Sequence, residues 1–230
     1  MTPIPENTMP LSERLRPQTF GDLTLPAREI DRFQRMSDTK NLMNMLFYGS
    51  PGMGKTSAAR IFLRSTDPMD TLRMDGSSQT SVHDVRNVID RFSSTMSWTG
   101  GLKLCFIDEA DFLSQSAQAS LRGIIENRAN CRFIMAVNDL SKIMPAIRSR
   151  MICIRFNISK ADRPGILKRI ENRLVVRLTE LGVPFDRERL NAIVATFFPD
   201  FRQIVSRLEY EFVLEGRGVP FGTADLEAGS

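Results

Sequence analysis

The sequence is poor in cysteine, with three in 230 residues, and it contains one histidine and one tryptophan. Cys105, Cys131 and Cys153 each lie among apolar residues. This odd number of thiols in strand-like surroundings predicts reduced core residues and argues against a disulfide or metal framework. We interpret His83 as incidental and Trp98 as a packing residue.

Long apolar runs are also missing. No stretch approaches the roughly 18 residues of a membrane span, and the N-terminus lacks a basic region followed by an apolar core, so neither a transmembrane helix nor a signal peptide is expected. Hydrophobic residues make up 42% and charged residues 25%, which is typical of a globular protein. The sequence therefore predicts a cytoplasmic protein without a membrane partner.

Lysine is scarce, because only six of the 31 basic residues are lysine and the rest are arginine. Arginine favours bidentate contacts to phosphate and carboxylate. The net charge is only +4, but basic residues gather between Arg148 and Arg177. Two interpretations of this cluster stay open: a solvated helix surface, and a site for an anionic partner.

Short apolar runs alternate with helical patterns up to residue 157, as in a βαβ architecture. Helices are expected at Lys55–Ser65, Val82–Met96, Gln115–Asn127 and, briefly, near Pro145. The nearly continuous hydrophobicity of two strands favours an α/β fold with a five-stranded parallel sheet covered on both faces. The expected strands are Met43–Tyr48, Thr71–Met74, Leu102–Ile107, Arg132–Val137 and Met151–Phe156.

The pattern changes after Phe156, where three amphipathic helices follow one another. We therefore expect an α/β nucleotide-binding domain at 1–157, a small three-helix domain at 158–216, and a flexible tail at 217–230 that is rich in glycine and small polar residues.

The stretch GSPGMGKT fits the phosphate-binding pattern G-x-x-x-x-G-K-[ST] between an expected strand and an expected helix. Glycines let successive amide hydrogens point inward, and the helix N-terminus adds positive charge. ATP phosphates are expected in this loop, with Lys55 on the β and γ groups and Thr56 on magnesium. A glycine-rich turn with a solvent-facing lysine is the alternative. The predicted ATP-binding residues here are Gly49, Ser50, Pro51, Gly52, Met53, Gly54, Lys55, Thr56 and Ser57.

An acidic pair, Asp108 and Glu109, ends the apolar stretch LKLCFIDEADF. An aspartate at the carboxyl end of a strand can bind magnesium, and Glu109 can polarise the attacking water. The alternative is that the acids cap the next helix, which explains Asp111 better than Asp108. We therefore predict ATP hydrolysis, with Thr56 and Asp108 as metal ligands.

The segments GSPGMGKT, CFIDEAD, FIMAVND and AIRSRM follow in the order and spacing of AAA+ ATPases, which the chain resembles. It resembles most closely the ATPase subunits of sliding-clamp loaders, of the replication factor C small-subunit type. LSERLRPQTFGDL, SQSAQASLRGIIE and FPDFRQIVSRLE are similar to the opening motif, a core helix and the lid helix of that family. LTLP and FPDFR resemble the T-even phage branch, for which the location would be the cytoplasm of a bacterial host.

The resemblance implies an AAA+ P-loop core followed by a three-helix lid. It also implies that Asn138 is a sensor that orients the attacking water or contacts the γ-phosphate. Arg150 matches the arginine finger, which acts in trans on ATP held by a neighbouring subunit. Arg202 matches a second sensor that links the γ-phosphate to the lid. With Lys55 and Glu109, these residues form the expected catalytic set.

Two further groups of residues are implied. Arg14, Arg16 and Pro17 lie in the segment that helps enclose the adenine. Arg86 and Arg91 match the helix that faces the DNA backbone in the spiral of subunits, although a solvated face is an equal reading for Arg86.

The resemblance implies a DNA-dependent ATPase subunit of a clamp loader. Its cofactors would be ATP and Mg²⁺, and its partners primer–template DNA, a sliding clamp and further subunits in a ring or spiral oligomer. A C-terminal collar domain, normal in such subunits, is expected to be missing. The alternatives are another DNA-remodelling or helicase-loading AAA+ ATPase, and a nucleotide-switched scaffold with little hydrolysis.

Overall fold

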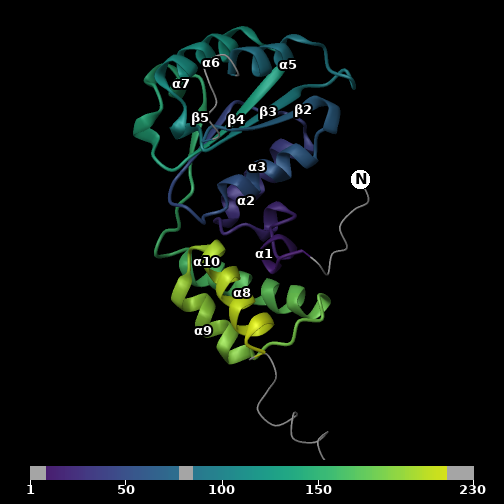
Figure 1. Ribbon diagram of the computed structural model, residues 1–230, viewed down its shortest axis with the longest axis vertical. Helices are drawn as coiled ribbons and strands as arrows, with labels where there is room; N and C mark the ends of the chain where they lie inside the picture. Colours follow the sequence, from purple (N-terminus) through teal and green to yellow (C-terminus); the bar gives the residue numbers. More distant parts are fainter. Residues whose placement is uncertain (1–8, 78–84, 217–230) are drawn as a thin grey trace, which may run out of the picture. The chain divides into compact units, whose positions relative to one another are not determined.

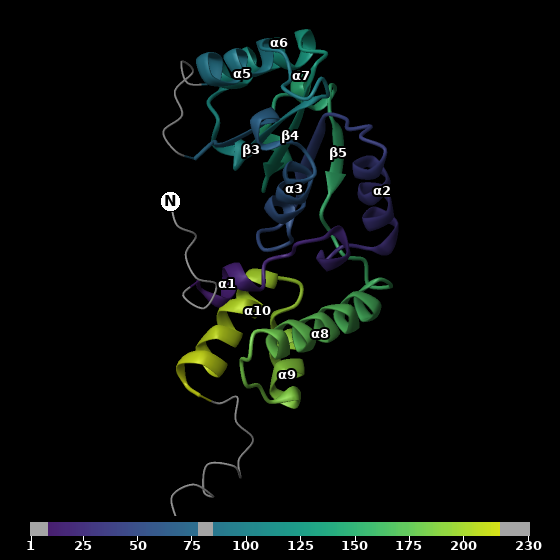
Figure 2. The same ribbon diagram turned by 90° about the vertical axis from the view of Figure 1, so that its right-hand side faces the viewer.

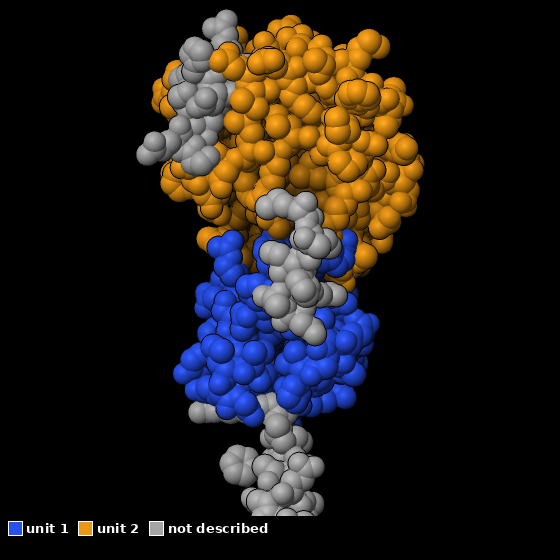
Figure 3. Space-filling model, turned by 45° about the vertical axis from the view of Figure 1, so that its right-hand side comes forward, with its two compact units in different colours: residues 1–18, 24–26, 158–230 blue, residues 19–23, 27–157 orange. Residues whose placement is uncertain are grey.

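A computed structural model of the chain describes residues 9–77 and 85–216. They form two compact units, which Figure 3 colours separately. The α/β unit comprises residues 19–23 and 27–157. The helical unit comprises the described residues from 158 onward together with residues 9–18 and 24–26. This N-terminal segment, expected from the sequence in the nucleotide-binding domain, is grouped with the C-terminal helices in the structure.

The α/β unit is built on one five-stranded sheet in the order β2-β3-β4-β1-β5, and all its neighbouring strands are parallel. The expected five-stranded parallel sheet is therefore confirmed. In register, Tyr48 lies opposite Val137 and Asp75 opposite Asp108, so these strands end along a shared edge. The strands are β1 Met45–Tyr48, β2 Thr71–Asp75, β3 Lys103–Asp108, β4 Cys131–Val137 and β5 Ile152–Arg155.

Helices cover both faces of this sheet, as Figures 1 and 2 show. Helices α2 (Ala27–Asp38) and α3 (Lys55–Arg64) lie on one face, and α5 (Asp90–Ser94), α6 (Gln115–Asn127) and α7 (Pro145–Arg148) on the other. The connections contain short 3₁₀ turns: η2 Phe20–Asp22, η3 Pro68–Asp70, η5 Ala110–Phe112 and η6 Leu140–Lys142.

The helix expected at Val82–Met96 differs from the observed one. Residues 82–84 lie outside the described residues, and the rest forms a π-helical segment, η4 (Val85–Ile89), that continues as α5 and ends at Ser94.

Two apolar layers hold the sheet between the helices. Alternate residues of a strand point to opposite faces, and both faces of the central strands are buried. Toward α6, the layer contains Phe133, Met135 and Val137 of β4. On the face covered by α2 and α3, five phenylalanines pack with ring centroids 4.7–6.3 Å apart. They are Phe20, Phe33, Phe47, Phe62 and Phe156. Burial of these aromatic rings stabilises this part of the core.

The helical unit contains α1 (Leu11–Arg14), α8 (Arg163–Glu180), α9 (Arg187–Phe197), α10 (Phe201–Leu208) and the π-helical η7 (Glu209–Leu214). Leu11 and Leu15 are buried in its apolar core, among residues of α8, α9 and α10. This burial explains why the N-terminal segment joins the C-terminal helices.

An arginine row on α8 also holds that segment. Arg169 donates to the carbonyl of Leu25 at 2.5 Å, and Arg173 to that of Leu15 at 2.6 Å. One turn further, Arg177 donates to the carbonyl oxygen of Arg14 at 3.2 Å. Residues four apart share one helix face, so this part of the basic cluster serves internal contacts, a use that neither reading of the cluster anticipated.

Two sequence interpretations of single residues are wrong. Cys105 and Cys131 are buried as expected, and burial raises the pKa of Cys105 well above its ordinary value and that of Cys131 to about 12. Cys153, however, is exposed, because it lies on the edge strand β5. Trp98 is 76% exposed in the loop before β3, and so it does not pack in the core.

Candidate ATP site

The phosphate-binding loop connects β1 to α3, and its glycines have backbone conformations that other residues rarely adopt. Gly49 has φ 141°, and a Cβ there would lie 2.4 Å from the carbonyl oxygen of Phe156. Gly52 and Gly54 have φ 76° and 88°. Gly54 directly precedes α3, so the loop leads into a helix N-terminus whose free amides attract anions.

Lys55 begins α3 and is 8% exposed. Its ammonium group donates to the carbonyls of Gly49 at 2.6 Å and Ser50 at 2.8 Å, and to the side-chain oxygen of Asn138 at 2.9 Å. An ammonium group has three donors. The reading of Lys55 as a solvent-facing residue is therefore wrong, since the lysine is buried within the loop and bonded to the residue that follows β4.

Thr56 and Asp108 meet at the same edge. The Thr56 hydroxyl lies 3.0 Å from Oδ1 of Asp108, which also accepts the backbone N–H of Glu109 at 3.2 Å. The other carboxylate oxygen lies 3.5 Å from the guanidinium of Arg73 on β2. The first helical turn after the loop and the last residue of β3 are thus in direct contact.

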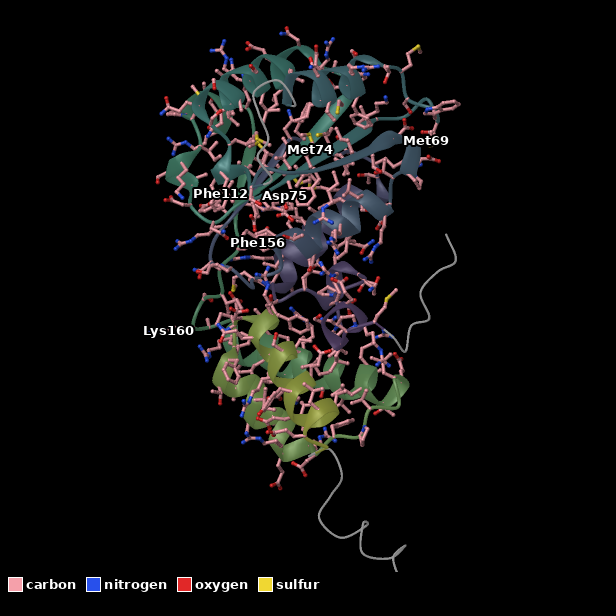
Figure 4. The ribbon with its side chains drawn as sticks, viewed as in Figure 1. Met69, Met74, Asp75, Phe112, Phe156 and Lys160 are labelled. Atoms are coloured by element: carbon pink, nitrogen blue, oxygen red, sulfur yellow. The ribbon has the colours of Figure 1, made fainter. Side chains whose placement is uncertain are left out.

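Glu109 is exposed at this edge and has left-handed backbone angles, φ 48° and ψ 40°. Such a conformation is uncommon for a residue with a side chain and clusters at functional sites. Glu109 opens the turn η5, and its carbonyl accepts the N–H of Phe112 at 3.0 Å. Figure 4 labels Asp75 and Phe112, which lie at this edge, and Met69 near the other end of β2.

Asp111 does not cap the following helix, contrary to the alternative considered for the acidic pair. The cap of α6 is Ser114, whose hydroxyl accepts the N–H of Ala117 at 3.2 Å. Asp111 is 8% exposed, and its Oδ2 accepts the backbone N–H of Asn138 at 3.3 Å. The two segments that follow β3 and β4 are thereby joined.

Helix α6 connects this edge to the arginine that follows α7. Gln118 is 2% exposed; it donates to the carbonyls of Leu113 and Lys142 at 3.1 and 3.0 Å and accepts the N–H of Met144 at 2.9 Å. Farther along α6, Glu126 pairs with Arg150 at 3.0 Å. Arg150 also donates to the carbonyl of Ala146 at 2.7 Å. Its guanidinium group is therefore held by both Glu126 and Ala146.

The remaining predicted residues belong to other elements of the two units. In the helical unit, Arg14 donates to the carbonyl of Leu181 at 3.3 Å, Arg16 pairs with Glu13, and Pro17 is buried. Arg202 is exposed in the first turn of α10. In the α/β unit, Arg91 is exposed on α5, and Arg86 belongs to η4.

Sequence reasoning missed four features around the site: Arg73, the anchoring contact of Asp111, Gln118 and Glu126. Arg73 gave no signal, because it lies within an ordinary strand pattern. The other three lie in segments quoted for the resemblance, but their partners are distant in sequence, so no local pattern reveals the contacts.

Comparison with known proteins identifies the domain. Residues 45–158 match the family model described as "ATPase family associated with various cellular activities (AAA)". The chain carries an AAA+ ATPase domain related to the small subunits of replication factor C. It is 33% identical over 226 residues to replication factor C subunit 5 of Mus musculus, covering 95% of this chain and 63% of that protein.

Two other replication factor C subunits show a similar degree of identity to the chain. The replication factor C small subunit of Methanoculleus marisnigri is 33% identical over 208 residues, covering 88% of this chain and 63% of the relative. Replication factor C subunit 3 of Oryza sativa is 31% identical over 209 residues, covering 87% and 56%. The chain therefore spans less than two thirds of the length of these relatives.

Solved structures support the AAA+ fold alone. The Holliday junction branch migration motor RuvB of Thermotoga maritima matches with a TM-score of 0.64 and 18% identity, covering 89% of this chain and 68% of RuvB. A DNA polymerase III gamma subunit-related protein of the same organism matches with a TM-score of 0.52 and 14% identity, covering 78% and 71%.

Two kinds of feature are absent from the described residues. None of their helices combines the length and apolarity needed to cross a membrane. Within residues 9–77 and 85–216, no three histidine, cysteine or acidic side chains are grouped so as to hold a metal ion.

Proposed function

We propose that this chain is a DNA-dependent ATPase subunit of a sliding-clamp loader. It would use ATP binding and hydrolysis to open a clamp and place it on primer–template DNA during replication. The observation that supports this best is the meeting of Lys55 with Asn138 and of Thr56 with Asp108 along one edge of the sheet. The relationship to replication factor C small subunits supports the choice of clamp loading.

The donor set at this edge fits Mg²⁺. Magnesium prefers hard oxygen ligands and is commonly bound by one or two protein oxygens together with phosphate oxygens and water. The hydroxyl of Thr56 and the carboxylate of Asp108 are such oxygens, 3.0 Å apart and next to the phosphate loop. The ion would offset charge on the β- and γ-phosphates.

Several residues of this chain would have separate roles in ATP hydrolysis. Lys55 and the loop amides from Gly49 to Ser57 would bind the phosphates, and Glu109 would orient the water that attacks the γ-phosphorus atom. Asn138 would hold that water or a γ-phosphate oxygen in place. Products are ADP and inorganic phosphate. Residues of the helical unit complete the proposal: Arg202 would sense the γ-phosphate, and Arg14, Arg16 and Pro17 would enclose the adenine.

Arg150 would act as an arginine finger on the ATP of a neighbouring subunit. The side-chain contacts of Arg150 among the described residues are to Glu126, Ala146 and Ser149, and none of them belongs to the phosphate loop. An arginine finger that contacts the ATP of a neighbouring subunit requires an oligomer, so ATP turnover would depend on assembly of the subunits.

DNA would be held through phosphate contacts from Arg86 and Arg91, giving binding that follows duplex shape and weakens with salt. Replacing either arginine by alanine should reduce the slope of log affinity against log salt concentration by about 1.

The decisive experiment measures steady-state ATP hydrolysis at several protein concentrations, with and without primer–template DNA. Turnover should rise with protein and DNA and fall at least ~10³-fold in Arg150→Ala, but not in the surface control Arg35→Ala. Glu109→Gln should be equally inactive. Mixing Glu109→Gln with Arg150→Ala should restore part of the activity, because one variant supplies the finger and the other the intact site.

Two outcomes would reject this function. Turnover that does not respond to DNA, even after the sliding clamp and partner subunits are added, would reject the clamp loader. If Glu109→Gln left turnover unchanged, the assigned hydrolytic mechanism would be wrong.

A further inference from the structure

The geometry points to Asp111 as a positioning residue: we propose that it anchors the backbone of Asn138 so that the side chain of this sensor stays at the catalytic edge when ATP draws Lys55 away. The inference rests on the proposed role of Asn138 in ATP hydrolysis, and it assigns a task to the last acidic residue of the segment IDEAD.

Burial of Asp111 costs free energy, because one of its carboxylate oxygens lacks a hydrogen-bond partner among the described residues. Asp111 is 8% exposed, and its Oδ1 is buried without a hydrogen-bond partner in the part of the chain that the structure describes. A buried polar atom without a partner costs about 1–3 kcal/mol. Helix capping does not explain Asp111, because Ser114 caps α6. Native structures rarely keep such a group without a purpose.

The other carboxylate oxygen of Asp111 holds the backbone of Asn138. Oδ2 accepts the backbone N–H of Asn138 at 3.3 Å, across 27 residues of sequence. Asn138 lies just past the end of β4 and is exposed there. A residue beyond the last strand pairing has no neighbouring strand to fix its N–H, so a side-chain acceptor replaces the ladder.

Nucleotide binding would change the contacts of Lys55. The ammonium of Lys55 contacts three protein oxygens, one of which is Oδ1 of Asn138. Its three donors are matched by these acceptors. To bind phosphate oxygens, Lys55 has to release at least one of them. When the bond to Asn138 is released, the asparagine loses its side-chain restraint, and the contact to Asp111 remains.

The contact also links the proposed sensor to Glu109, the residue proposed to orient the water. Glu109 opens the turn η5, and Asp111 lies within that same turn. The hydrogen bond from Asn138 to Asp111 therefore connects both residues that would act on the water to one short turn. A displacement of about 1 Å in such groups can reduce the rate by about 10²-fold.

The test compares Asp111→Leu, Asp111→Asn and Asn138→Ala. Leucine has a similar shape and removes the unpartnered oxygen, so the melting temperature should stay equal or rise, while kcat should fall about 10–100-fold with KM within about 3-fold. Asparagine keeps an acceptor for the N–H and should restore kcat to within about 3-fold of wild type. The double variant Asp111→Leu/Asn138→Ala should have the kcat of Asn138→Ala, since both changes remove one function.

A second measurement does not depend on turnover. Amide hydrogen exchange at residue 138 should be at least 10-fold faster in Asp111→Leu than in wild type. The matched control is Asp139→Ala, which removes a carboxylate that accepts from Ser141 without touching the N–H of Asn138. It should leave exchange at residue 138 within about 2-fold.

Several results would overturn the inference: unchanged exchange in Asp111→Leu, equal losses of kcat in the leucine and asparagine variants, or additive losses in the double variant. A failure of the proposed function would be seen separately. In that case Asn138→Ala would not change turnover, whereas the exchange result would still report the anchoring contact.

Discussion

The ammonium of Lys55 lies 2.9 Å from the side-chain oxygen of Asn138, although 83 residues separate them in sequence. One residue comes from the helix that follows β1 and the other from the end of β4, and these two strands are neighbours in the sheet. The bond thus joins the proposed phosphate-binding loop to the proposed sensor residue. Because Lys55 is the proposed phosphate ligand, this contact would compete with the nucleotide for its donors.

If Asn138 and ATP compete for Lys55, removing the Asn138 side chain should affect ATP binding and ATP turnover differently. In Asn138→Ala, the affinity for ATP should stay equal or rise up to about 3-fold, because an acceptor that occupies Lys55 is removed, while kcat should fall about 10–100-fold. Titration with a fluorescent ATP analogue and steady-state kinetics check this. Lys55→Ala is the control, in which binding itself should be lost; weaker binding in Asn138→Ala would contradict the competition.

Gly49 should not tolerate a side chain. In Gly49→Ala, the φ of 141° and the 2.4 Å approach to the carbonyl of Phe156 both oppose a Cβ, so we expect a loss of more than about 2 kcal/mol of unfolding free energy and of ATP binding. Urea denaturation measures the first and nucleotide titration the second.

Gly123 provides the matched control. It lies inside α6, and a Cβ there would meet nothing within 4 Å. Gly123→Ala should therefore stabilise the protein by about 0.5–1 kcal/mol through helix propensity. If both variants changed stability alike, the strain assigned to Gly49 would be wrong.

A buried acid should hold the end of the helical unit together. The side chain of Glu211 has no exposed surface; Arg189 contacts both of its oxygens, at 2.5 and 2.7 Å, and Arg207 contacts it at 2.6 Å. Glu211→Gln leaves two guanidinium groups without their carboxylate. Because both arginines are partly exposed, we expect a loss of about 2–3 kcal/mol, below the roughly 3–5 kcal/mol for a fully buried pair.

The unfolding free energy of Glu211→Gln, measured by urea denaturation, is compared with that of the control variant Glu180→Gln. Glu180 makes an exposed ion pair with Arg177 at 2.7 Å, and its removal should cost less than about 1 kcal/mol. A similarly small loss in Glu211→Gln would show that solvent replaces the missing carboxylate.

Asp70 should make stability depend on pH in acid. Burial alone raises its pKa, but hydrogen bonds from Ser97, Trp98 and Thr99 together outweigh burial and lower the pKa from 3.8 to about 2. Since the folded pKa is below the unfolded one, the stabilisation is complete above about pH 4 and is lost as the pH falls toward 2. The difference in unfolding free energy between wild type and Asp70→Asn should shrink across this interval. A difference that stayed constant would contradict the lowered pKa.

The sequence alone determined the parts of this protein whose chemistry demands particular residues close together in the chain. The phosphate loop, the acidic pair after an apolar strand and the parallel sheet were predictable, because glycine conformation, strand hydrophobicity and local order leave a readable pattern. Asn138 was found through resemblance, and the structure brings it to Lys55.

Only the tertiary structure decided the contacts whose partners are remote. Asp111 reads as a helix cap locally, yet its carboxylate accepts from a residue 27 positions away, because β3 and β4 end side by side. The arginines of α8 read as a charged surface, yet Arg173 meets the carbonyl of Leu15 across 158 residues. Packing brings such groups together, and a carboxylate or guanidinium takes its role from whichever partner the fold supplies.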